Sequence, residues 1–247
     1  MCGIVGYAGE KPAAPILLRA LHDLEYRGYD SAGICVLSPN GEDHPLVVTK
    51  RQGKIVNLEA ALASSDPLDG TTGIGHTRWA THGKPSDQNA HPHLSCNGEI
   101  VVIHNGIVEN YAELRTELAK GGHAFQSETD TETIAHLVED AAGPGTSLLD
   151  ALRQTAARLQ GSQAIVAMSI REPGVIVAAR LGNAGGVVIG HGDGEMVLAS
   201  DLAAILPHTQ RVSFLADRQF ARMDAAGVEV VDALGDPVDL PAKTVPI

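Results

Sequence analysis

The sequence CGIVGYA, residues 2–8, decides how the fold begins, because it is a short apolar run that starts on a cysteine. Such a run predicts a buried β-strand. Pro12 follows, and the apolar residues between Ile16 and Leu24 recur at helical spacing, which predicts a helix next along the chain. Cys2 therefore stands at the start of a structured element, directly after Met1.

Cys2 has unusual chemistry if Met1 is removed, because its α-amine then becomes free. The residue then combines a thiol with a reference pKa of about 8.5 and an amine with one of about 7.7 to 8.0. The amine can accept the proton of the thiol, so a nucleophile of this kind needs no histidine base. Taken alone, Cys2 fits equally well as an ordinary residue at the start of a buried strand.

Strand patterns and a long polar loop follow in the first half of the chain. Two β-rich runs at 32–38 and 45–51 flank Pro39-Asn40-Gly41, which predicts a β-hairpin. Another strand pattern covers 72–76. The polar segment 77–93 then shows no periodicity, and long loops of this kind are often lids or binding loops.

The second half of the chain has helical patterns between two groups of strands. A strand is predicted over 99–106, followed by helices over 110–122 and 129–142 that both begin with capping-box spacing. A third helix is expected over 149–159. Short strands from Ala164 onward predict a second sheet, mostly antiparallel. This order of strands, helices and strands predicts an α+β layered sandwich.

The composition excludes several classes of partner. With 247 residues, 44% hydrophobic and 19% charged, the chain is expected to form one globular domain. Its net charge is −12 and its basic residues are scattered, so neither nucleic acid nor an anionic membrane is an expected partner. No apolar run is long enough to span a bilayer and the N-terminus does not resemble a signal peptide, which predicts a cytoplasmic protein.

The cysteines and histidines do not form a recognisable metal motif. Cys2, Cys35 and Cys96 are an odd number without a CxxC pair, which argues against a disulfide framework and a zinc ribbon. Cys35 lies in an apolar run and is expected to be a small buried hydrophobe. Several of the eleven histidines, including His76 and His93, are close in sequence but lack metal-ligand spacing. We therefore predict no metal and no cofactor.

The segment HTRWATHG, residues 76–83, contains two candidate binding residues. Arg78 could hold a substrate carboxylate through two parallel hydrogen bonds, or it could be an ordinary surface arginine. Trp79, the only tryptophan, could be a packed anchor or part of a loop that excludes water.

Two further positions have both a structural and a functional interpretation. Asn105-Gly106 resembles a hairpin turn, but the residues after it predict a helix and not a partner strand. The Asn105 amide and the Gly106 backbone N–H could instead form an oxyanion hole. Asp130, in the first turn of a predicted helix, could interact with the helix dipole or bind an ammonium group.

Six motifs occur in series and together resemble one family. They are MCGIVGY, LEYRGYDSAG, GHTRWATHG, NAHPH, VVIHNGIVEN and SETDTETIAHL. In this order they are similar to the glutaminase domain of the glutamine–fructose-6-phosphate aminotransferase family, which belongs to the class II amidotransferases. The resemblance extends from Cys2 to roughly Leu206.

The resemblance implies a fold and a set of roles. The implied fold is the N-terminal nucleophile hydrolase fold, a four-layer αββα sandwich. Cys2 would be the nucleophile and, through its α-amine, the base, with Asn105 and Gly106 as the oxyanion hole. Arg78 would bind the carboxylate of the glutamine substrate and Asp130 its α-amine. The other implied positions are Thr81 and His82 in the substrate pocket, Trp79 on the closing loop and Arg27 near the cysteine end.

The resemblance also implies what this chain lacks. Enzymes of the family continue into sugar-isomerase domains that accept the ammonia and act on fructose 6-phosphate, and the full-length enzyme could assemble as a homo-oligomer. Nothing in these 247 residues resembles those domains. We expect a glutaminase domain over 1–240 and a linker tail over 241–247, which together release glutamate and ammonia from L-glutamine.

Two segments depart from the family pattern, Leu181–Gly186 and Asp217–Gln219, and we expect the departures to affect loops of the second sheet without affecting the active site. Two other functions are consistent with the sequence. One is an N-terminal nucleophile amidase with a different amide substrate. The other is a catalytically silent glutamine-binding module, in which Met1 is retained or Cys2 is blocked.

Overall fold

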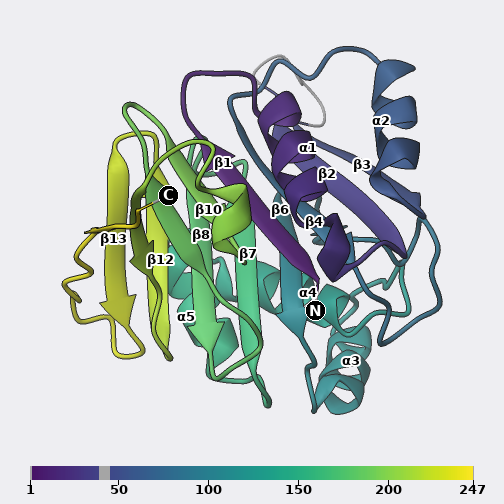
Figure 1. The fold of residues 1–247 in the computed structure, drawn as a ribbon. Coiled ribbons are helices and arrows are strands. Elements are labelled where there is room, and N and C mark those ends of the chain that lie inside the picture. The colour runs from purple at the N-terminus through teal and green to yellow at the C-terminus, as the bar shows by residue number, and fades with distance from the viewer. Residues whose placement is uncertain (1, 39–44, 247) are drawn as a thin grey trace.

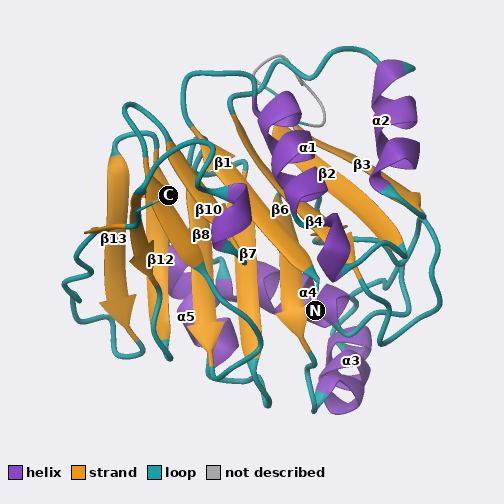
Figure 2. Cartoon of the chain, viewed as in Figure 1, coloured by secondary structure: helices purple, strands orange, loops and turns teal. Residues whose placement is uncertain are grey.

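Two antiparallel β-sheets pack face to face, and helices cover the outer side of each sheet (Figures 1 and 2). The computed structural model describes residues 2–38 and 45–246. This arrangement is the predicted α+β sandwich, with the four αββα layers that the family resemblance implies.

The described residues form an eight-stranded and a six-stranded sheet in which neighbouring strands are antiparallel. The larger sheet has the order β14 (Lys243–Thr244), β11 (Arg211–Phe214), β9 (Val188–His191), β10 (Met196–Ala199), β1 (Gly3–Ala8), β4 (Thr72–Arg78), β2 (Ser31–Leu37) and β3 (Leu46–Gln52). The smaller sheet has the order β13 (Gly227–Asp232), β12 (Gln219–Asp224), β8 (Ile176–Leu181), β7 (Gln163–Ser169), β6 (Ile100–Gly106) and β5 (His93–Leu94). The helices are α1 (Ala13–Asp23), α2 (Ile55–Ala63), α3 (Tyr111–Lys120), α4 (Thr131–Ala141) and α5 (Leu148–Ala156), with short 3-10 turns at Glu25–Arg27 and Leu202–Ala204.

Three apolar clusters hold the four layers together. The first lies between the sheets, the second between the smaller sheet and α3 to α5, and the third between the larger sheet and α1 with α2. In β1 the side chain of Ile4 belongs to the first cluster and those of Val5 and Tyr7 to the third. The strand is therefore buried on both faces, which explains its continuous apolar sequence.

The strands after Ala164 do not form one sheet, so this prediction was wrong. β7, β8, β12 and β13 belong to the smaller sheet, whereas β9, β10 and β11 extend the larger one. β10 pairs with β1, with Val5 opposite Ala199. Membership of a sheet is decided by such long-range pairing, which the local composition of a strand does not record.

The helix boundaries agree with the predictions more closely than the caps do. Asn110 precedes α3, but its side chain bonds to the Arg158 carbonyl at 2.9 Å and to the Gln160 N–H at 3.0 Å, outside the helix. At α4 the Thr129 hydroxyl accepts from the Glu132 N–H at 3.4 Å, which is half of the predicted capping box, whereas the Glu132 carboxylate accepts from the Ser127 N–H and holds the preceding loop. β2 and β3 pair as predicted, whereas the turn Pro39-Asn40-Gly41 lies outside the described residues.

The end of the chain also contains a strand pair. The residues of β14 lie opposite Arg211 and Val212 of β11, within the segment expected to be a linker tail. The boundary between residues 240 and 241 remains a prediction.

Candidate active site

A pocket of about 470 Å³ opens between the two sheets at the end where β1 begins. Cys2 precedes β1, Arg78 ends β4, and Asn105 and Gly106 end β6, and all four line the pocket. β1 and β4 are antiparallel, so the start of one lies beside the end of the other. β6 contributes from the facing sheet, which explains how residues far apart in sequence meet here.

The Cys2 thiol is held at the edge of the pocket by the backbone of Trp79. The Trp79 N–H donates to Sγ at 3.1 Å, and Sγ lies 3.6 Å from the Trp79 carbonyl oxygen. Burial raises the pKa of the thiol, and the Trp79 N–H and the positive charge of Arg78 act in the opposite direction. The surroundings therefore include groups that favour a thiolate, although burial dominates in the resting protein.

The Asn105 side chain is oriented by two polar contacts. Its Nδ2 donates to the Cys2 carbonyl oxygen at 2.9 Å, and its Oδ1 lies 3.0 Å from Nε2 of His76. The same Nε2 lies 3.1 Å from the His104 carbonyl oxygen. Both neighbours of Nε2 are acceptors, so the proton of the neutral His76 ring belongs on Nε2. Burial lowers the pKa of His76 to about 3, which keeps the ring neutral.

Gly106 occupies a position that only glycine fits. Its φ is +129°, and a Cβ atom there would lie 2.2 Å from the Ser162 carbonyl oxygen. The backbone can therefore turn away from β6 next to Asn105 only because the side chain is absent. This geometry places backbone polar groups beside the pocket.

Two opposite charges line the same pocket, and both side chains are buried. Arg78 donates through Nη2 to the carbonyl oxygens of His82 and Gly83, whereas its Nη1 is buried without a hydrogen-bond partner among the described residues. Asp130, at the start of α4, accepts from the Val108 N–H at 2.9 Å. A guanidinium with an unused donor and a carboxylate in one cavity suit a ligand that carries both charges, such as an amino acid.

The other predicted site residues lie around this pocket in different ways. Trp79 is 49% exposed and packs edge-on against Tyr29, with the ring centroids 5.7 Å apart. Thr81 lines the pocket. The His82 ring is not among the lining side chains and lies against Tyr111, 5.1 Å away, so only its carbonyl serves the site, by accepting from Arg78.

Arg27 also lies outside the lining of the pocket. Its Nη1 is 2.7 Å from Oδ2 of Asp201, in the turn after β10. The positive charge of Arg27 is one of those that lower the pKa of Cys2. Arg27 therefore lies near the cysteine end without lining the pocket, and its supporting role remains a prediction.

The sequence interpretation missed part of the lining. Asn183 and Ala184, in the loop after β8, line the pocket together with Cys2. The prediction that the unusual segment 181–186 leaves the active site unaffected was therefore wrong, because this loop folds over the same cavity. Nothing in the local sequence of the loop indicates that it lies beside the Cys2 pocket. Other lining residues that were not predicted are His76, His91, His104, Ile107, Glu109, Thr131 and Ser162.

Known proteins resemble this chain over most of its length. The model of the glutamine amidotransferase domain family matches residues 64–230. Glutamine–fructose-6-phosphate aminotransferase (isomerizing) of Thermus thermophilus is 50% identical over 245 residues, and that of Aquifex aeolicus is 48% identical over 238. These alignments cover 99% and 96% of this chain but only 39% of each relative.

Two solved structures share the fold of this chain. The glutamine phosphoribosylpyrophosphate amidotransferase of Bacillus subtilis superposes with a TM-score of 0.77 and 27% identity, over 94% of this chain and 49% of that one. A glutamine aminotransferase class-II domain protein of Silicibacter pomeroyi, 17% identical with a TM-score of 0.61, shares the fold over 94% of this chain and 99% of its own. In the described residues, no helix has the length and apolar character needed to cross a membrane.

The fold is thus the N-terminal nucleophile hydrolase sandwich of the class II amidotransferases, as the sequence motifs imply. The family model covers most of the chain and includes β4, β6 and the start of α4, the elements that supply most of the pocket. The chain belongs to the glutamine amidotransferase domain family.

Proposed function

We propose that this chain hydrolyses L-glutamine to glutamate and ammonia through a thioester on Cys2. The observation that carries the proposal is the meeting of three groups in one pocket: the Cys2 thiol, the oriented Asn105 amide and the unused Nη1 donor of Arg78. Membership of the glutamine amidotransferase domain family supports the same reaction.

The first half of the reaction forms the thioester. After removal of Met1, the α-amine of Cys2 takes the thiol proton, and the sulfur attacks the side-chain amide carbon of glutamine. The former amide oxygen becomes negative and is stabilised by Asn105 Nδ2 and the Gly106 N–H. Nδ2 has two hydrogens, so one can stay on the Cys2 carbonyl while the other meets the oxyanion.

The second half regenerates the thiol. The protonated α-amine gives its proton to the departing nitrogen, the C–N bond breaks, and ammonia leaves. Water then attacks the thioester carbon, with the same amine accepting one of its protons. The C–S bond breaks, glutamate is released, and that proton returns to the sulfur. The α-amine of Cys2 thus transfers the protons in both halves of the reaction.

The charged residues of the pocket select the substrate. Arg78 would bind the α-carboxylate through the donor that has no protein partner among the described residues, and Asp130 would bind the α-ammonium group. The two contacts fix one end of the amino acid, so the length of its side chain decides whether the amide carbon reaches sulfur. Asparagine, one methylene shorter, should therefore be a poor substrate. Thr81 would line the site, and Trp79 would lie on the loop that closes over it.

We also propose that the ammonia serves a larger enzyme. This chain spans 39% of the length of its aminotransferase relatives, so the sugar-isomerase part that would accept ammonia and act on fructose 6-phosphate is not within it. The names of these relatives support the formation of an amino sugar phosphate as the purpose of glutamine hydrolysis. The full-length protein could form homo-oligomers, as the sequence motifs imply.

The test is an assay of glutamate release with glutamine and asparagine side by side. Glutamine should be hydrolysed and asparagine should not. Cys2→Ala should abolish turnover and leave the melting temperature nearly unchanged, because a small residue is kept at the start of β1. Cys35→Ala, which removes a buried thiol from β2 outside the pocket, should retain turnover. Substantial turnover by Cys2→Ala would refute the thioester mechanism.

Intact mass distinguishes the enzyme from a silent glutamine-binding module. An active chain must have lost Met1, because an amide nitrogen at Cys2 does not titrate and cannot act as the base. A chain that carries any uncleaved residue before Cys2 should therefore bind glutamine without releasing glutamate. Full turnover by such an extended chain would contradict the proposed role of the α-amine.

A further inference from the structure

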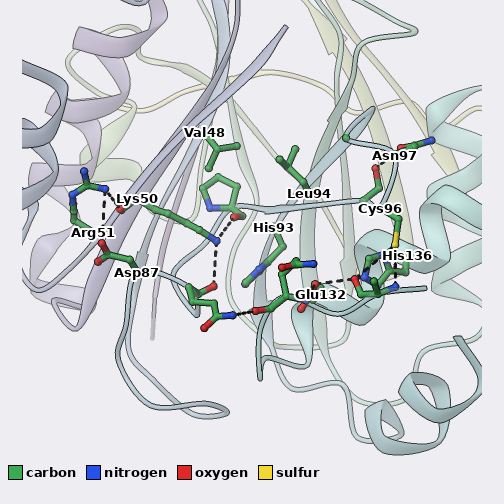
Figure 3. Close-up of a pocket in the computed structure, with 16 residues that line it drawn as sticks. Val48, Lys50, Arg51, Asp87, His93, Leu94, Cys96, Asn97, Glu132 and His136 are labelled. Carbon is green, nitrogen blue, oxygen red and sulfur yellow. Dashed lines mark hydrogen bonds and ion pairs between the residues drawn. The ribbon is translucent and has the colours of Figure 1, made fainter. Parts of the chain in front are cut away.

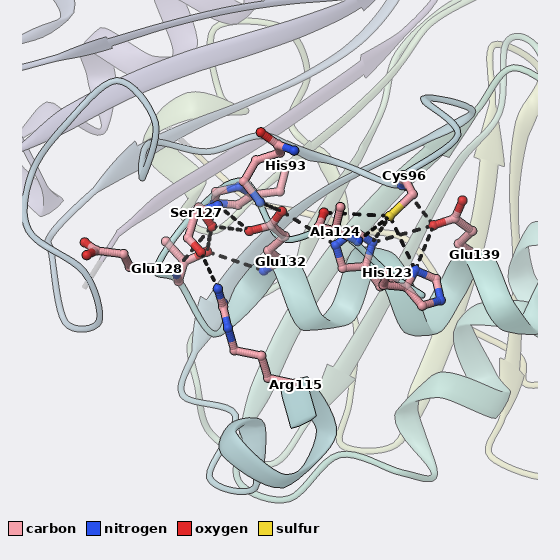
Figure 4. A network of polar contacts seen from close by, with 12 residues as sticks. His93, Cys96, Arg115, His123, Ala124, Ser127, Glu128, Glu132 and Glu139 are labelled. Atoms are coloured by element: carbon pink, nitrogen blue, oxygen red, sulfur yellow. Dashed lines mark hydrogen bonds and ion pairs between the residues drawn. The ribbon is translucent and has the colours of Figure 1, made fainter. Parts of the chain in front are cut away.

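Four side chains with metal-binding atoms meet on the face of the smaller sheet that carries α4, away from the Cys2 pocket. Cys96 lies in the turn after β5, His123 in the loop after α3, and His136 and Glu139 one turn apart on α4. Their ligand atoms all lie within 4.8 Å of one another. Figure 4 shows Cys96, His123 and Glu139 pointing toward one another from these three segments.

Four of the six separations between these ligand atoms match those of a tetrahedral zinc site, and the other two are within 4.8 Å. Cys96 Sγ lies 3.5 Å from His123 Nδ1 and 3.6 Å from His136 Nδ1. Glu139 Oε2 lies 3.4 Å from the first of these nitrogens and 3.5 Å from the second. Usual zinc bond lengths at tetrahedral angles give about 3.6 Å for sulfur to nitrogen and about 3.4 Å for nitrogen to oxygen.

We propose that Cys96, His123, His136 and Glu139 together bind one Zn²⁺ ion. A thiolate, two imidazoles and a carboxylate form a ligand set that zinc accepts, in the geometry that it prefers. All four positions come from the protein, so the ion would join three segments and leave no open position for a substrate. The site is therefore structural.

A carboxylate behind His123 orients that ring for this role. Nε2 of His123 lies 2.9 Å from Oδ1 of Asp140. A carboxylate bonded to Nε2 favours the proton on that nitrogen and leaves the Nδ1 lone pair for a metal. Nε2 of His136 lies 3.5 Å from Oε1 of Glu132 without a hydrogen bond among the described residues, and its Nδ1 faces Cys96 and Glu139.

Backbone groups orient the other two ligands. The N–H groups of Cys96 and Asn97 donate to the two oxygens of Glu139, each at 2.9 Å. The Ala124 N–H donates to Cys96 Sγ at 3.3 Å, a contact that stabilises a thiolate. These groups also fix the positions of the sulfur and of Oε2 before any ion binds.

The cluster has an excess of negative charge that a dication would balance. The carboxylate of Glu139 lies within the cluster, and those of Glu132 and Asp140 lie near the Nε2 atoms of its two histidines. Zinc would bind Cys96 as the thiolate, and its positive charge would offset these carboxylates. The side chain of His136 is only 1% exposed, and the ring of Phe125 covers it at 4.7 Å, so part of the site is shielded from water.

The proposed site borders a second cavity, of about 760 Å³, which shares none of its lining residues with the Cys2 pocket. Figure 3 shows Cys96 and His136 at one end of this cavity and Lys50 at the other. An ion at the cluster would thus hold one wall of this cavity together without direct contact with the glutamine site.

Cobalt substitution tests the site on the whole chain. The protein is freed of metal with a chelator under reducing conditions and titrated with Co²⁺, which reports ligand type by its absorption. We expect one equivalent, strong visible bands typical of tetrahedral coordination and a thiolate charge-transfer band in the near ultraviolet. One equivalent of Zn²⁺ should then remove these bands and raise the melting temperature. Weak bands typical of octahedral coordination, or the lack of a stoichiometric endpoint, would overturn the proposal.

Three variants locate the ion. Cys96→Ser should remove the charge-transfer band and lower zinc affinity at least about a hundredfold, because a thiolate ligand is lost. Cys2→Ser should keep both the charge-transfer band and the zinc affinity, and this result would exclude chelation by the amino-terminal cysteine. Asp140→Asn should lower the affinity by about tenfold to a hundredfold with the spectrum retained, because only the group behind His123 changes.

Asp66→Asn, at an exposed position outside the cluster, is the control for Asp140→Asn. An unchanged charge-transfer band in Cys96→Ser, or its loss in Cys2→Ser, would refute the assignment. Unaltered affinity in Asp140→Asn would refute the role of the carboxylate behind His123. If Cys96→Ser does not fold, the cobalt titration of Cys2→Ser still decides, because a hydrogen-bonded cluster alone gives no thiolate charge-transfer band.

Discussion

At the scale of single residues, the candidate active site depends on side chains that buried neighbours hold in place. His76 does not contact the thiol, yet it is 3.0 Å from Asn105 Oδ1 and thereby directs Nδ2 toward Cys2. Arg78 is similar, because its Nη2 holds the carbonyl oxygens of the following loop and its Nη1 is left for a ligand. Buried partners thus orient the Asn105 amide and the Arg78 guanidinium before a ligand binds.

The substitution Asn105→Asp separates a structural from a catalytic role. Aspartate keeps the size of the side chain but replaces the Nδ2 donor by an oxygen, which repels the oxyanion. We expect turnover to fall by about a hundredfold to a thousandfold, as for loss of one oxyanion-hole donor. Binding of glutamate should weaken less, because the charge develops only during the reaction. Asn57→Asp, at an exposed position on α2, serves as the control.

Turnover and thermal melting of Asn105→Asp should be measured together. The aspartate oxygen would also face the Cys2 carbonyl oxygen, so some loss of melting temperature is expected. Lost turnover in a variant that is still folded at the assay temperature supports the oxyanion hole. Near-normal turnover would mean that Asn105 has only a structural role, at the end of β6.

The substitution Arg78→Lys tests the binding of the substrate carboxylate. Lysine keeps the charge but cannot hold the loop carbonyls and a carboxylate at the same time. We expect KM for glutamine to rise about tenfold to a hundredfold, the equivalent of one hydrogen bond to a charged group. Steady-state kinetics with Arg51→Lys as control measure this, since Arg51 lies outside the pocket and its side chain is 46% exposed. Unchanged kinetics in Arg78→Lys would remove Arg78 from the substrate site.

At the scale of elements, the ends of the strands matter more than their centres. β1, β4 and β6 contribute their apolar centres to the core, while Cys2 just before β1 and the last residues of β4 and β6 line the pocket. The loop after β8 completes the lining with Asn183 and Ala184. Rigid strands therefore position the reactive groups, while an irregular loop from another part of the chain covers them.

The substitution Gly106→Ala tests the end of β6. A Cβ atom at Gly106 would lie 2.2 Å from the Ser162 carbonyl, at a φ of +129°. Gly122 also has a positive φ, +101°, but a Cβ atom there would have no described neighbour within 4 Å, so Gly122→Ala has the backbone strain without the clash. We expect Gly106→Ala to lose about 1 to 3 kcal/mol more of the free energy of unfolding than Gly122→Ala, as in overpacked sites. Chemical denaturation measures both, and equal losses would show that β6 can move aside.

At the scale of the whole molecule, four buried histidines lie close together, and three of them line the Cys2 pocket. The rings of His76 and His91 are stacked, with centroids 4.1 Å apart, and His93 lies edge-on to His91 at 5.0 Å. His104 is buried beside them on β6. Burial lowers the pKa of all four, so the folded protein keeps them neutral.

These four histidines predict a loss of stability in mild acid. Histidine in the unfolded chain has a pKa of about 6.5, so below that pH the unfolded state takes up protons that the folded state does not. The free energy of unfolding should have its full value above about pH 6.5 and decrease as the pH falls further. For His76 alone, whose folded pKa is about 3, the loss at about pH 5.5 is about 1.4 kcal/mol.

Urea denaturation at about pH 7.5 and about pH 5.5 measures this loss. Because four histidines are buried, the urea concentration at the unfolding midpoint should be clearly lower at about pH 5.5 than at about pH 7.5. Most carboxylates titrate below this pH range. An equal free energy of unfolding at the two values would mean that the histidines take up protons in the folded protein.

Local sequence determined much of this protein. The two-sided burial of β1 follows from its continuous apolar run, and the helix boundaries follow from periodicity, because both depend on neighbours along the chain. The candidates Cys2, Arg78, Asn105 and Asp130 were recognisable because their motifs are local. The structure brings these four residues to one pocket.

Only the tertiary structure decided which distant segments meet. It assigns β9 to β11 to the larger sheet, places Asn183 over the active site, and brings Cys96 to within 3.6 Å of His136, 40 residues away. The sequence led to a prediction of no metal, because the partners of His136 and Glu139 in the proposed zinc site come from two other segments. Such contacts depend on strand pairing and packing across the whole chain, and no local pattern of residues encodes them.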